Sequence, residues 1–363
     1  MNPKKYRLIL TGTDPTSNSG GIGVALRAYI SSLQSNNISF ESIPTYSPSS
    51  SFGKYLLFLF TLPKIFRSIR ASRRNSDICI IYSHAGANLS LFREGIVVLL
   101  SRLFGARTVM HIHAAQTISY LASPLKKYLF LTTLIGVQHV FVLTSWAKNK
   151  YLNAGVKKSI TVIPNPIDLV WEHCTPKVHA NPEASTRRNI LVMTRLVDGK
   201  GVDLVIDAMP YLYSDFKLNI AGTGPQLDAL KTQVKKLDQE NSVNFFGWVT
   251  GDTKQRLIDD ADIFCHPTSL DAMPMNILEA MANGLPVVAL NWGPIRELVP
   301  DGVAGFLVAS DNPKEIAAAI LKMKDLRIRQ KMGMEARQWV IENFSSQVIG
   351  LRLDSVFKDI AGV

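Results

Sequence analysis

Two carboxylates, Asp271 and Glu279, stand eight positions apart in the stretch SLDAMPMNILEAMANGLPVVA, residues 269–289. Acids at a loop–helix junction could serve as a general acid and base, as metal ligands, or as acceptors for a ligand rich in hydroxyl groups. Gly-Leu-Pro follows and predicts the end of a helix, and the β-branched run after it predicts a buried strand. The spacing alone leaves all three kinds of site open.

Cations and glycines occur where a strand is expected to pass into a helix. In VMTRLVDGKGVD (192–203), Arg195 offers a planar fork and Lys200 a point charge, which together suit a diphosphate. In AGTGP (221–225), Gly222 and Gly224 are expected to open a helix whose first N–H groups can approach an anion. This half of the chain therefore carries the groups of a phosphate site.

A third glycine-rich loop lies near the N-terminus, in TGTDPTSNSGGIGVALRAYI (11–30), with Gly20, Gly21 and Gly23 at a helix start. Glu41 follows at roughly the 20-residue offset of a dinucleotide site. Leu26 occupies the third glycine position, however, and a long polar loop separates the strand from the glycines, so nicotinamide binding is disfavoured. Walker-type binding is also disfavoured, because no Gly-Lys-Ser/Thr follows.

Two histidines, His111 and His113 in MHIHAA, share one face of an expected strand. A metal site is possible in principle, but the sequence shows no third ligand. We therefore expect both rings to be satisfied by hydrogen bonds.

Short apolar runs alternate with helix-length segments along the whole chain, which predicts parallel sheets covered by helices on both faces. We expect two facing doubly wound α/β domains, at 1–168 and 187–344, joined by a linker at 169–186. A final helix at about 345–363 is expected to pack back on the first domain. Ligands would bind at the carboxyl ends of the strands, in the cleft between the domains. The expected strands are 6–11, 78–82, 107–112, 139–143, 159–163, 189–194, 217–221, 243–246, 262–265, 287–290 and 305–308, with helices such as 21–34 and 89–104.

The net charge of +11 is concentrated in the first domain. Residues 1–168 hold 19 Lys and Arg against 5 Asp and Glu, or +14, and residues 169–363 hold 21 against 24, or −3. Nucleic acid is disfavoured as a partner, since stacking aromatic residues are not interleaved with the basic ones. The segment 54–74 mixes basic residues with Leu and Phe. It is either a helix lying on an anionic membrane or an ordinary amphipathic surface helix.

The compartment is expected to be the reducing cytoplasm. Cys79, Cys174 and Cys265 form no even framework, and no secretory signal is evident. The apolar stretch 128–146 carries Gly136, Gln138 and His139 in its middle, so we interpret it as a core helix running into a buried strand.

Several motifs occur together in one order: GGIG (20–23), IPNPID (163–168), TRLVDGKG (194–201), AGTGP (221–225), the 269–289 stretch and DGVAGFLV (301–308). This arrangement resembles the retaining glycosyltransferases of the GT-B fold, in particular the family 4 (group 1) enzymes that build bacterial surface polysaccharides. The resemblance covers nearly the whole chain.

The resemblance implies roles residue by residue. Arg195 and Lys200 match the pair that neutralises the diphosphate leaving group, Glu279 matches the acid that holds the ribose, and Asp271 matches the acid near the donor sugar. His113 matches the histidine that contacts the transferred sugar, with His111 as the alternative. The implied catalytic residues are Asp271, His113, Arg195 and Lys200, and the implied donor-binding residues are Gly21, Gly23, Arg195, Lys200, Gly222, Gly224, Met273, Pro274, Met275 and Glu279.

Two departures from the commonest family pattern bear on the ligand. The first acid is Asp271, one methylene shorter than Glu, and Ala272 stands where glycine is usual, which leaves the donor sugar open. Asp260-Ala261-Asp262 matches the metal-binding Asp-x-Asp of another transferase fold, but it precedes a strand, so we interpret Asp262 as structural. No metal or other cofactor is expected, because Arg195 and Lys200 supply the positive charge.

The resemblance thus implies transfer of a sugar from a nucleotide-sugar to a hydroxyl of a lipid-linked or oligosaccharide acceptor, with retention. The protein would work in the cytoplasm, with possible peripheral binding to the inner face of the plasma membrane. The alternatives are a nucleotide-sugar 2-epimerase of related fold and a non-catalytic scaffold that kept the fold.

Overall fold

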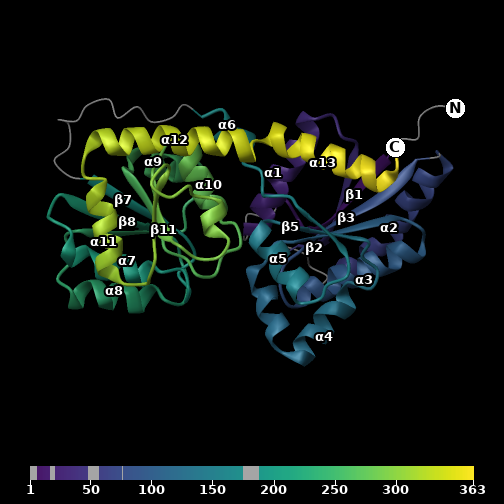
Figure 1. The fold of residues 1–363 in the computed structure, drawn as a ribbon, viewed down its shortest axis with the longest axis horizontal. Helices are drawn as coiled ribbons and strands as arrows, with labels where there is room; N and C mark the ends of the chain where they lie inside the picture. The colour runs from purple at the N-terminus through teal and green to yellow at the C-terminus, as the bar shows by residue number, and fades with distance from the viewer. Residues whose placement is uncertain (1–5, 17–20, 48–56, 76, 175–187) are drawn as a thin grey trace. The chain divides into compact units, whose positions relative to one another are not determined.

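The computed structural model describes residues 6–16, 21–47, 57–75, 77–174 and 188–363 (Figure 1). The chain divides into two compact units: Met1–Leu169 with Phe344–Val363, and Val170–Asn343. Most of the predicted linker, from 175 onward, lies outside the described residues.

The first unit holds a six-stranded sheet, all parallel, in the order β2-β1-β3-β4-β5-β6. Helices α1 and α13 pack against one another on one face, and α2, α3 and α4 follow one another on the other face (Figure 1). The elements are β1 (Tyr6–Thr13), α1 (Gly21–Ser35), β2 (Phe40–Tyr46), α2 (Leu57–Arg74), β3 (Ile78–Ala85), α3 (Leu89–Leu103), β4 (Arg107–Ile112), η1 (Ala115–Ala122), α4 (Pro124–Thr133), β5 (His139–Val142), α5 (Ser145–Asn153), β6 (Ser159–Val162) and α13 (Ser346–Ala361).

The second unit repeats the design with a parallel sheet in the order β12-β11-β10-β7-β8-β9. An apolar cluster lies between the sheet and α7, α8 and α11. The elements are α6 (Leu169–Glu172, beginning in the first unit), β7 (Arg188–Met193), α7 (Val202–Ala208), η2 (Met209–Tyr211), β8 (Phe216–Ala221), α8 (Leu227–Lys236), β9 (Val243–Gly247), α9 (Gly251–Asp260), β10 (Ile263–His266), α10 (Met275–Ala282), β11 (Val287–Leu290), η3 (Ile295–Glu297), β12 (Gly305–Val308), α11 (Pro313–Lys322) and α12 (Leu326–Phe344).

Both predicted parallel sheets are therefore confirmed, and each expected strand is present to within a few residues. Strand β2 was not predicted from the sequence. Its segment, FESIPTY, carries a proline and a glutamate, and only Ile43 and Thr45 are buried. The strand lies at the edge of the sheet, where proline is tolerated, so it lacks the apolar run of a central strand.

The expectation of a core helix at the start of 128–146 is wrong. Helix α4 ends at Thr133, and only Phe130 and Thr133 of it are buried, while Leu125 and Tyr128 are exposed. The buried strand that was expected to follow is present as β5. Among the described residues, no helix combines the length and the apolar character needed to cross a bilayer.

The strand orders define one switch point in each sheet, where the chain changes its direction of progress across the sheet. It lies between β1 and β3 in the first unit and between β7 and β10 in the second. Loops that leave the carboxyl ends of two such strands run apart and open a crevice, where ligands of doubly wound folds bind. The two switch points are therefore the places to look for a site.

Candidate active site

An ion pair between Lys200 and Asp271 lies at the switch point of the second unit. The Lys200 ammonium is 2.5 Å from Oδ1 and 2.7 Å from Oδ2 of Asp271, and the Lys200 residue is only 6% exposed. Lys200 comes from the β7–α7 loop and Asp271 from the β10–α10 loop. The structure thus joins two residues that the sequence analysis assigned to different parts of the ligand.

His266, the last residue of β10, orients the same carboxylate. Its Nε2 atom lies 3.0 Å from Oδ2 of Asp271, and its Nδ1 atom faces the Asn276 side-chain amide at 3.4 Å. Burial lowers the pKa of His266, so the ring is neutral and donates from Nε2. Burial alone would raise the pKa of Asp271, but the His266 hydrogen bond and the Lys200 charge lower it, and the carboxylate stays ionised.

Arg195 stands apart from this cluster. Its side chain is exposed, and within the described part of the chain it has no hydrogen bond or ion pair. It follows β7 directly, at the same switch point as Lys200. A guanidinium in this position is available to an incoming anion, whereas the Lys200 ammonium is already shared with Asp271.

Glycines allow the loops to meet. Gly201 has a φ of +71°, and a Cβ added there would lie 2.2 Å from the Pro267 carbonyl oxygen, so a side chain would push apart the loops that carry Lys200 and Asp271. A Cβ on Gly222 or Gly224 would meet the backbone of Thr194 or Leu196 in the same way.

The helix expected to open at Gly222 and Gly224 begins later, since α8 starts at Leu227. The N–H of Gly222 donates to the Gly247 carbonyl over 2.7 Å and is not available to an anion. These two glycines bring the β7–α7 and β8–α8 loops together, and their predicted contact with the donor stays a prediction.

Glu279 lies in α10, as expected, one turn after the Met273-Pro274-Met275 segment that precedes and opens the helix. Glu279 is 3% exposed, and its Oε2 accepts a 2.6 Å hydrogen bond from the Lys254 ammonium of α9. Met273 and Met275 are buried. A cavity of about 570 Å³ adjoins the 199–201 loop, but Arg195, Lys200, Asp271 and Glu279 do not line it.

Asp262 has the structural surroundings that the sequence suggested. Its Oδ2 accepts the Asn189 backbone N–H over 2.9 Å, and its Oδ1 lies 3.9 Å from the Arg329 guanidinium. These contacts tie the start of β7 to the β10 edge and the following helical layer.

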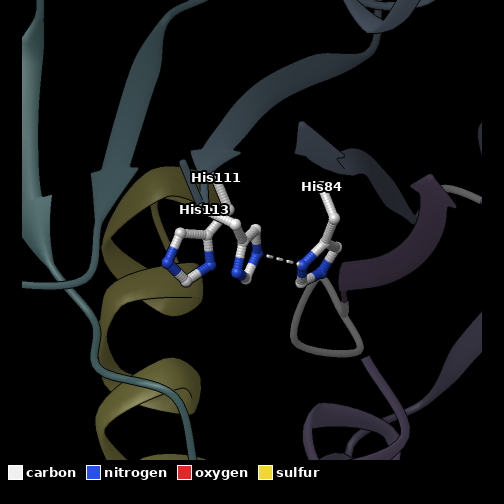
Figure 2. A group of neighbouring side chains, drawn as sticks. All are labelled: His84, His111 and His113. Atoms are coloured by element: carbon white, nitrogen blue, oxygen red, sulfur yellow. Dashed lines mark hydrogen bonds between the residues drawn. The ribbon is translucent and has the colours of Figure 1, made fainter. Parts of the chain in front are cut away.

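Three histidines lie at the carboxyl ends of β3 and β4, beside the switch point of the first unit (Figure 2). His84 on β3 lies opposite His111 on β4, and His113 follows β4. The Nδ1 atom of His84 is 2.9 Å from the Nε2 atom of His113, and Tyr82 Oη is 2.8 Å from Nδ1 of His111. Burial lowers the pKa of all three rings, to about 3 for His113, so each is neutral.

The glycine loop of the first unit is described from Gly21 onward, and Gly20 lies outside the described residues. Gly21 is the first residue of α1 and is exposed, with open space where a Cβ would be, and Gly23 is buried. Their predicted contact with the diphosphate stays a prediction.

Sequence reasoning did not identify His84, His266 or Lys254. The signal for His84 and His266 is their place at or next to the carboxyl end of a strand that borders a switch point. Lys254 carries no such signal, because it lies within a polar helix and reaches Glu279 only through the packing of α9 against its neighbours.

Comparison with known proteins agrees with this geometry. The family described as glycosyl transferases group 1 matches residues 176–339. An uncharacterized glycosyltransferase of Methanocaldococcus jannaschii is 31% identical over 195 residues, which is 53% of this chain and 50% of the relative. The putative colanic acid biosynthesis glycosyltransferase WcaL of Salmonella typhimurium is 28% identical over 182 residues, 47% of this chain and 45% of the relative.

The chain thus spans about half the length of these curated relatives. Among solved structures, that of HepE from Anabaena in complex with UDP and glucose superposes with a TM-score of 0.72 at 20% identity, covering 96% of this chain and 99% of that one. This likeness shows a shared GT-B fold. Residues 176–339 thus match the group 1 glycosyltransferases, and the chain has the two parallel six-stranded sheets of the GT-B fold.

Proposed function

We propose that the protein transfers a sugar from a nucleotide-sugar to a hydroxyl group of a lipid-linked or oligosaccharide acceptor during polysaccharide synthesis. The observation that carries the proposal is the cluster at the second switch point, where Lys200, Asp271 and His266 are bonded together. Arg195, which pairs with no described residue, follows β7 at the same switch point. The colanic acid assignment of WcaL and the UDP bound to HepE agree with it.

In this proposal the two cations act on the diphosphate. Arg195, which pairs with no described residue, can pair with the diphosphate directly. Lys200 can turn from Asp271 toward the diphosphate as negative charge develops on the leaving group. Asp271 would then accept a hydrogen bond from a hydroxyl of the donor sugar, while His266 holds the Asp271 carboxylate in place. Glu279 would receive the ribose hydroxyls.

We propose transfer with retention. The bond between the anomeric carbon and the diphosphate oxygen breaks while the acceptor oxygen bonds to the same face of that carbon. The acceptor proton passes to the departing phosphate oxygen, so the step needs no side-chain nucleophile. Arg195 and Lys200 neutralise the charge of the leaving group in this proposal. We therefore expect transfer to proceed in the presence of a chelator.

A panel of nucleotide-sugars tests this function. The matching donor should raise the melting temperature of the purified protein, and adding it with a membrane extract should release nucleoside diphosphate. Proton NMR of the product then reports the anomeric configuration. Stabilisation by no nucleotide-sugar, together with no release, would refute the transferase proposal.

We further propose that the first unit binds an anionic membrane surface. Helix α2 buries Ile65 and Ile69 and exposes Leu59 and Phe60. The exposed residues of α2 also include Lys64, Arg67, Arg70, Arg73 and Arg74. Neighbouring α3 and α4 add Leu103, Leu125 and Tyr128 to the exposed apolar surface. Such a mixture of basic and apolar groups suits anionic lipid head groups and would bring a lipid-linked acceptor to the enzyme.

A further inference from the structure

The three histidines of the first unit converge from two adjacent strands. His84 and His111 are register partners in the β3–β4 ladder, so their side chains leave the sheet on the same face. His113, two residues beyond His111, turns its ring between them, as Figure 2 shows. One ring nitrogen from each histidine lies within 4.8 Å of the others.

The cluster is enclosed by aromatic rings of the same unit. Tyr29 of α1 lies with its ring centroid 5.2 Å from those of His84 and His111 and 6.0 Å from that of His113. Tyr82 lies beside His111 on the same side of the sheet. His84 and His111 are fully buried, and His113, at 9% exposure, is the ring nearest to solvent.

Half of the six ring nitrogens have no hydrogen-bond partner. The paired ones are Nδ1 of His84 with Nε2 of His113, and Nδ1 of His111 with the Tyr82 hydroxyl. Nε2 of His84, Nε2 of His111 and Nδ1 of His113 remain buried without a hydrogen bond. The Ile163 carbonyl and the Asn165 side chain interact with His111 and His113 respectively, but too weakly to offset the effect of burial.

Unsatisfied buried imidazole nitrogens are unfavourable, and such groups in a folded protein call for an explanation. Each neutral imidazole offers one lone pair, and three such nitrogens are the donor set of many zinc sites. One lone pair is used in the His84–His113 hydrogen bond, which a bound ion would replace. A site whose ligands are all imidazole nitrogens, with no carboxylate, suits Zn²⁺, Cu²⁺ or Ni²⁺ and does not suit Mg²⁺ or Mn²⁺.

The geometry is close to what a bound ion needs. Zn–N bonds of about 2.0–2.1 Å in a tetrahedral site place the nitrogens about 3.3 Å apart. The present spacing of up to 4.8 Å would therefore close by small ring rotations. If the Tyr82 hydroxyl accepts the N–H on Nδ1 of His111, it leaves Nε2 of that ring with its lone pair, as outer partners of metal-bound histidines commonly do.

We propose that His84, His111 and His113 bind one transition-metal ion in the first unit, with Zn²⁺ as the ion that fits best. The site lies at the carboxyl ends of β3 and β4, beside the switch point between β1 and β3, and it does not include Arg195, Lys200 or Asp271. It is therefore independent of the charge neutralisation proposed for the diphosphate, and zinc binding can be tested without any transferase activity. His113, which the resemblance places against the transferred sugar, would serve here as a metal ligand.

Tag-free, full-length protein is the material for the test, since an affinity tag of histidines would itself bind the ion. After treatment with a chelator and dialysis, the protein is titrated with Zn²⁺ against a chromophoric competitor, and its melting temperature is measured with Zn²⁺ and with Mg²⁺. We expect one Zn²⁺ per chain, a rise in melting temperature with Zn²⁺, and no change with Mg²⁺. Absence of stoichiometric Zn²⁺ binding by the wild-type protein would overturn the proposal without any variant.

Variants then locate the site. His84→Asn and His111→Asn should each weaken Zn²⁺ binding at least tenfold, and His139→Gln, in the next strand, should leave it unchanged. Binding retained in both cluster variants, or lost in His139→Gln, would place the ion elsewhere. Should a cluster variant fail to fold, Co²⁺ bound to the wild-type protein provides a second measurement. The strong visible absorption that is typical of tetrahedral Co²⁺ would support a three-histidine site. The weak absorption that is typical of octahedral Co²⁺ would contradict it.

Discussion

The Lys200 ammonium contacts both carboxylate oxygens of Asp271, at 2.5 and 2.7 Å, in a site where Lys200 is almost fully buried. A cation held in this way is positioned before a ligand arrives. Replacing either residue with an uncharged one therefore removes the ion-pair partner of the other.

Removing one partner should therefore destabilise the protein more than removing both. A fully buried pair loses about 3–5 kcal/mol when broken. Because the Asp271 side chain is 22% exposed, we expect a loss of about 2–3 kcal/mol for Lys200→Met or Asp271→Asn. The double variant should lose less than either single variant. Urea unfolding of the four proteins measures this, and strict additivity would show that the pair is not coupled.

Arg195 should matter to ligand binding and not to stability, because it is exposed and makes no hydrogen bond or ion pair with any described residue. We expect Arg195→Ala to change the unfolding free energy by less than about 0.5 kcal/mol. Losing a charge-assisted pair worth about 1.5–3 kcal/mol should weaken nucleoside diphosphate binding by tenfold or more. Isothermal titration checks this, with Arg327→Ala on α12 as the matched control. Equal affinity in both variants would remove Arg195 from the site.

Lowering the pH should reduce the contribution of the Asp271 carboxylate to the free energy of unfolding. Its folded pKa lies below the ordinary value of about 3.9, so the carboxylate stabilises the fold above that pH, and the contribution is lost as the pH falls through the folded pKa. The difference in unfolding free energy between wild type and Asp271→Asn should change little from pH 7 to 5 and shrink below about pH 4. A difference that grows on acidification would contradict the assignment.

Glu279 should discriminate between ligands with and without a ribose. If its carboxylate receives the ribose hydroxyls, Glu279→Gln should weaken nucleoside diphosphate binding about tenfold, since a hydrogen bond to a charged group is worth about 1.5–3 kcal/mol. Inorganic pyrophosphate binding should not change. Glu315→Gln, at an exposed position on α11, is the control. An equal loss for both ligands would assign Glu279 to the phosphate or to folding through Lys254.

The alternation of apolar strands with helices was enough to predict both sheets, because buried parallel strands require continuous apolar runs. Strand β2 escaped this rule, since an edge strand with Pro44 and Glu41 has no such run. The apolar content of α4 was misleading for the opposite reason. Leu125, Tyr128 and Leu129 of this helix are exposed, and periodicity in sequence does not say which apolar face a neighbour covers.

The contacts between side chains within the two sites could not be predicted from the sequence. Lys200 and Asp271 are 71 residues apart, and they meet because β7 and β10 are neighbours in the sheet, which no local pattern reveals. His84 was not predicted as a site residue for a different reason. The strand was expected to end at residue 82, but it continues to Ala85 and carries His84 into register with His111. Three more strand residues turn an incomplete pair of histidines into a group of three.

Binding to membranes should depend on the basic face of α2. Arg67 and Arg70 are exposed, and basic residues near an anionic bilayer contribute about 1 kcal/mol each. Arg67→Gln with Arg70→Gln should therefore lower the affinity for anionic vesicles about 30-fold. Arg327→Gln with Lys331→Gln, the same charge loss on α12, should have little effect. Co-sedimentation with anionic and zwitterionic vesicles measures both. Because salt shortens the screening length from about 10 Å at 0.1 M to about 3 Å at 1 M, binding should fall steeply with salt. Binding that ignores both lipid charge and salt would mean that α2 is only a surface helix of the fold.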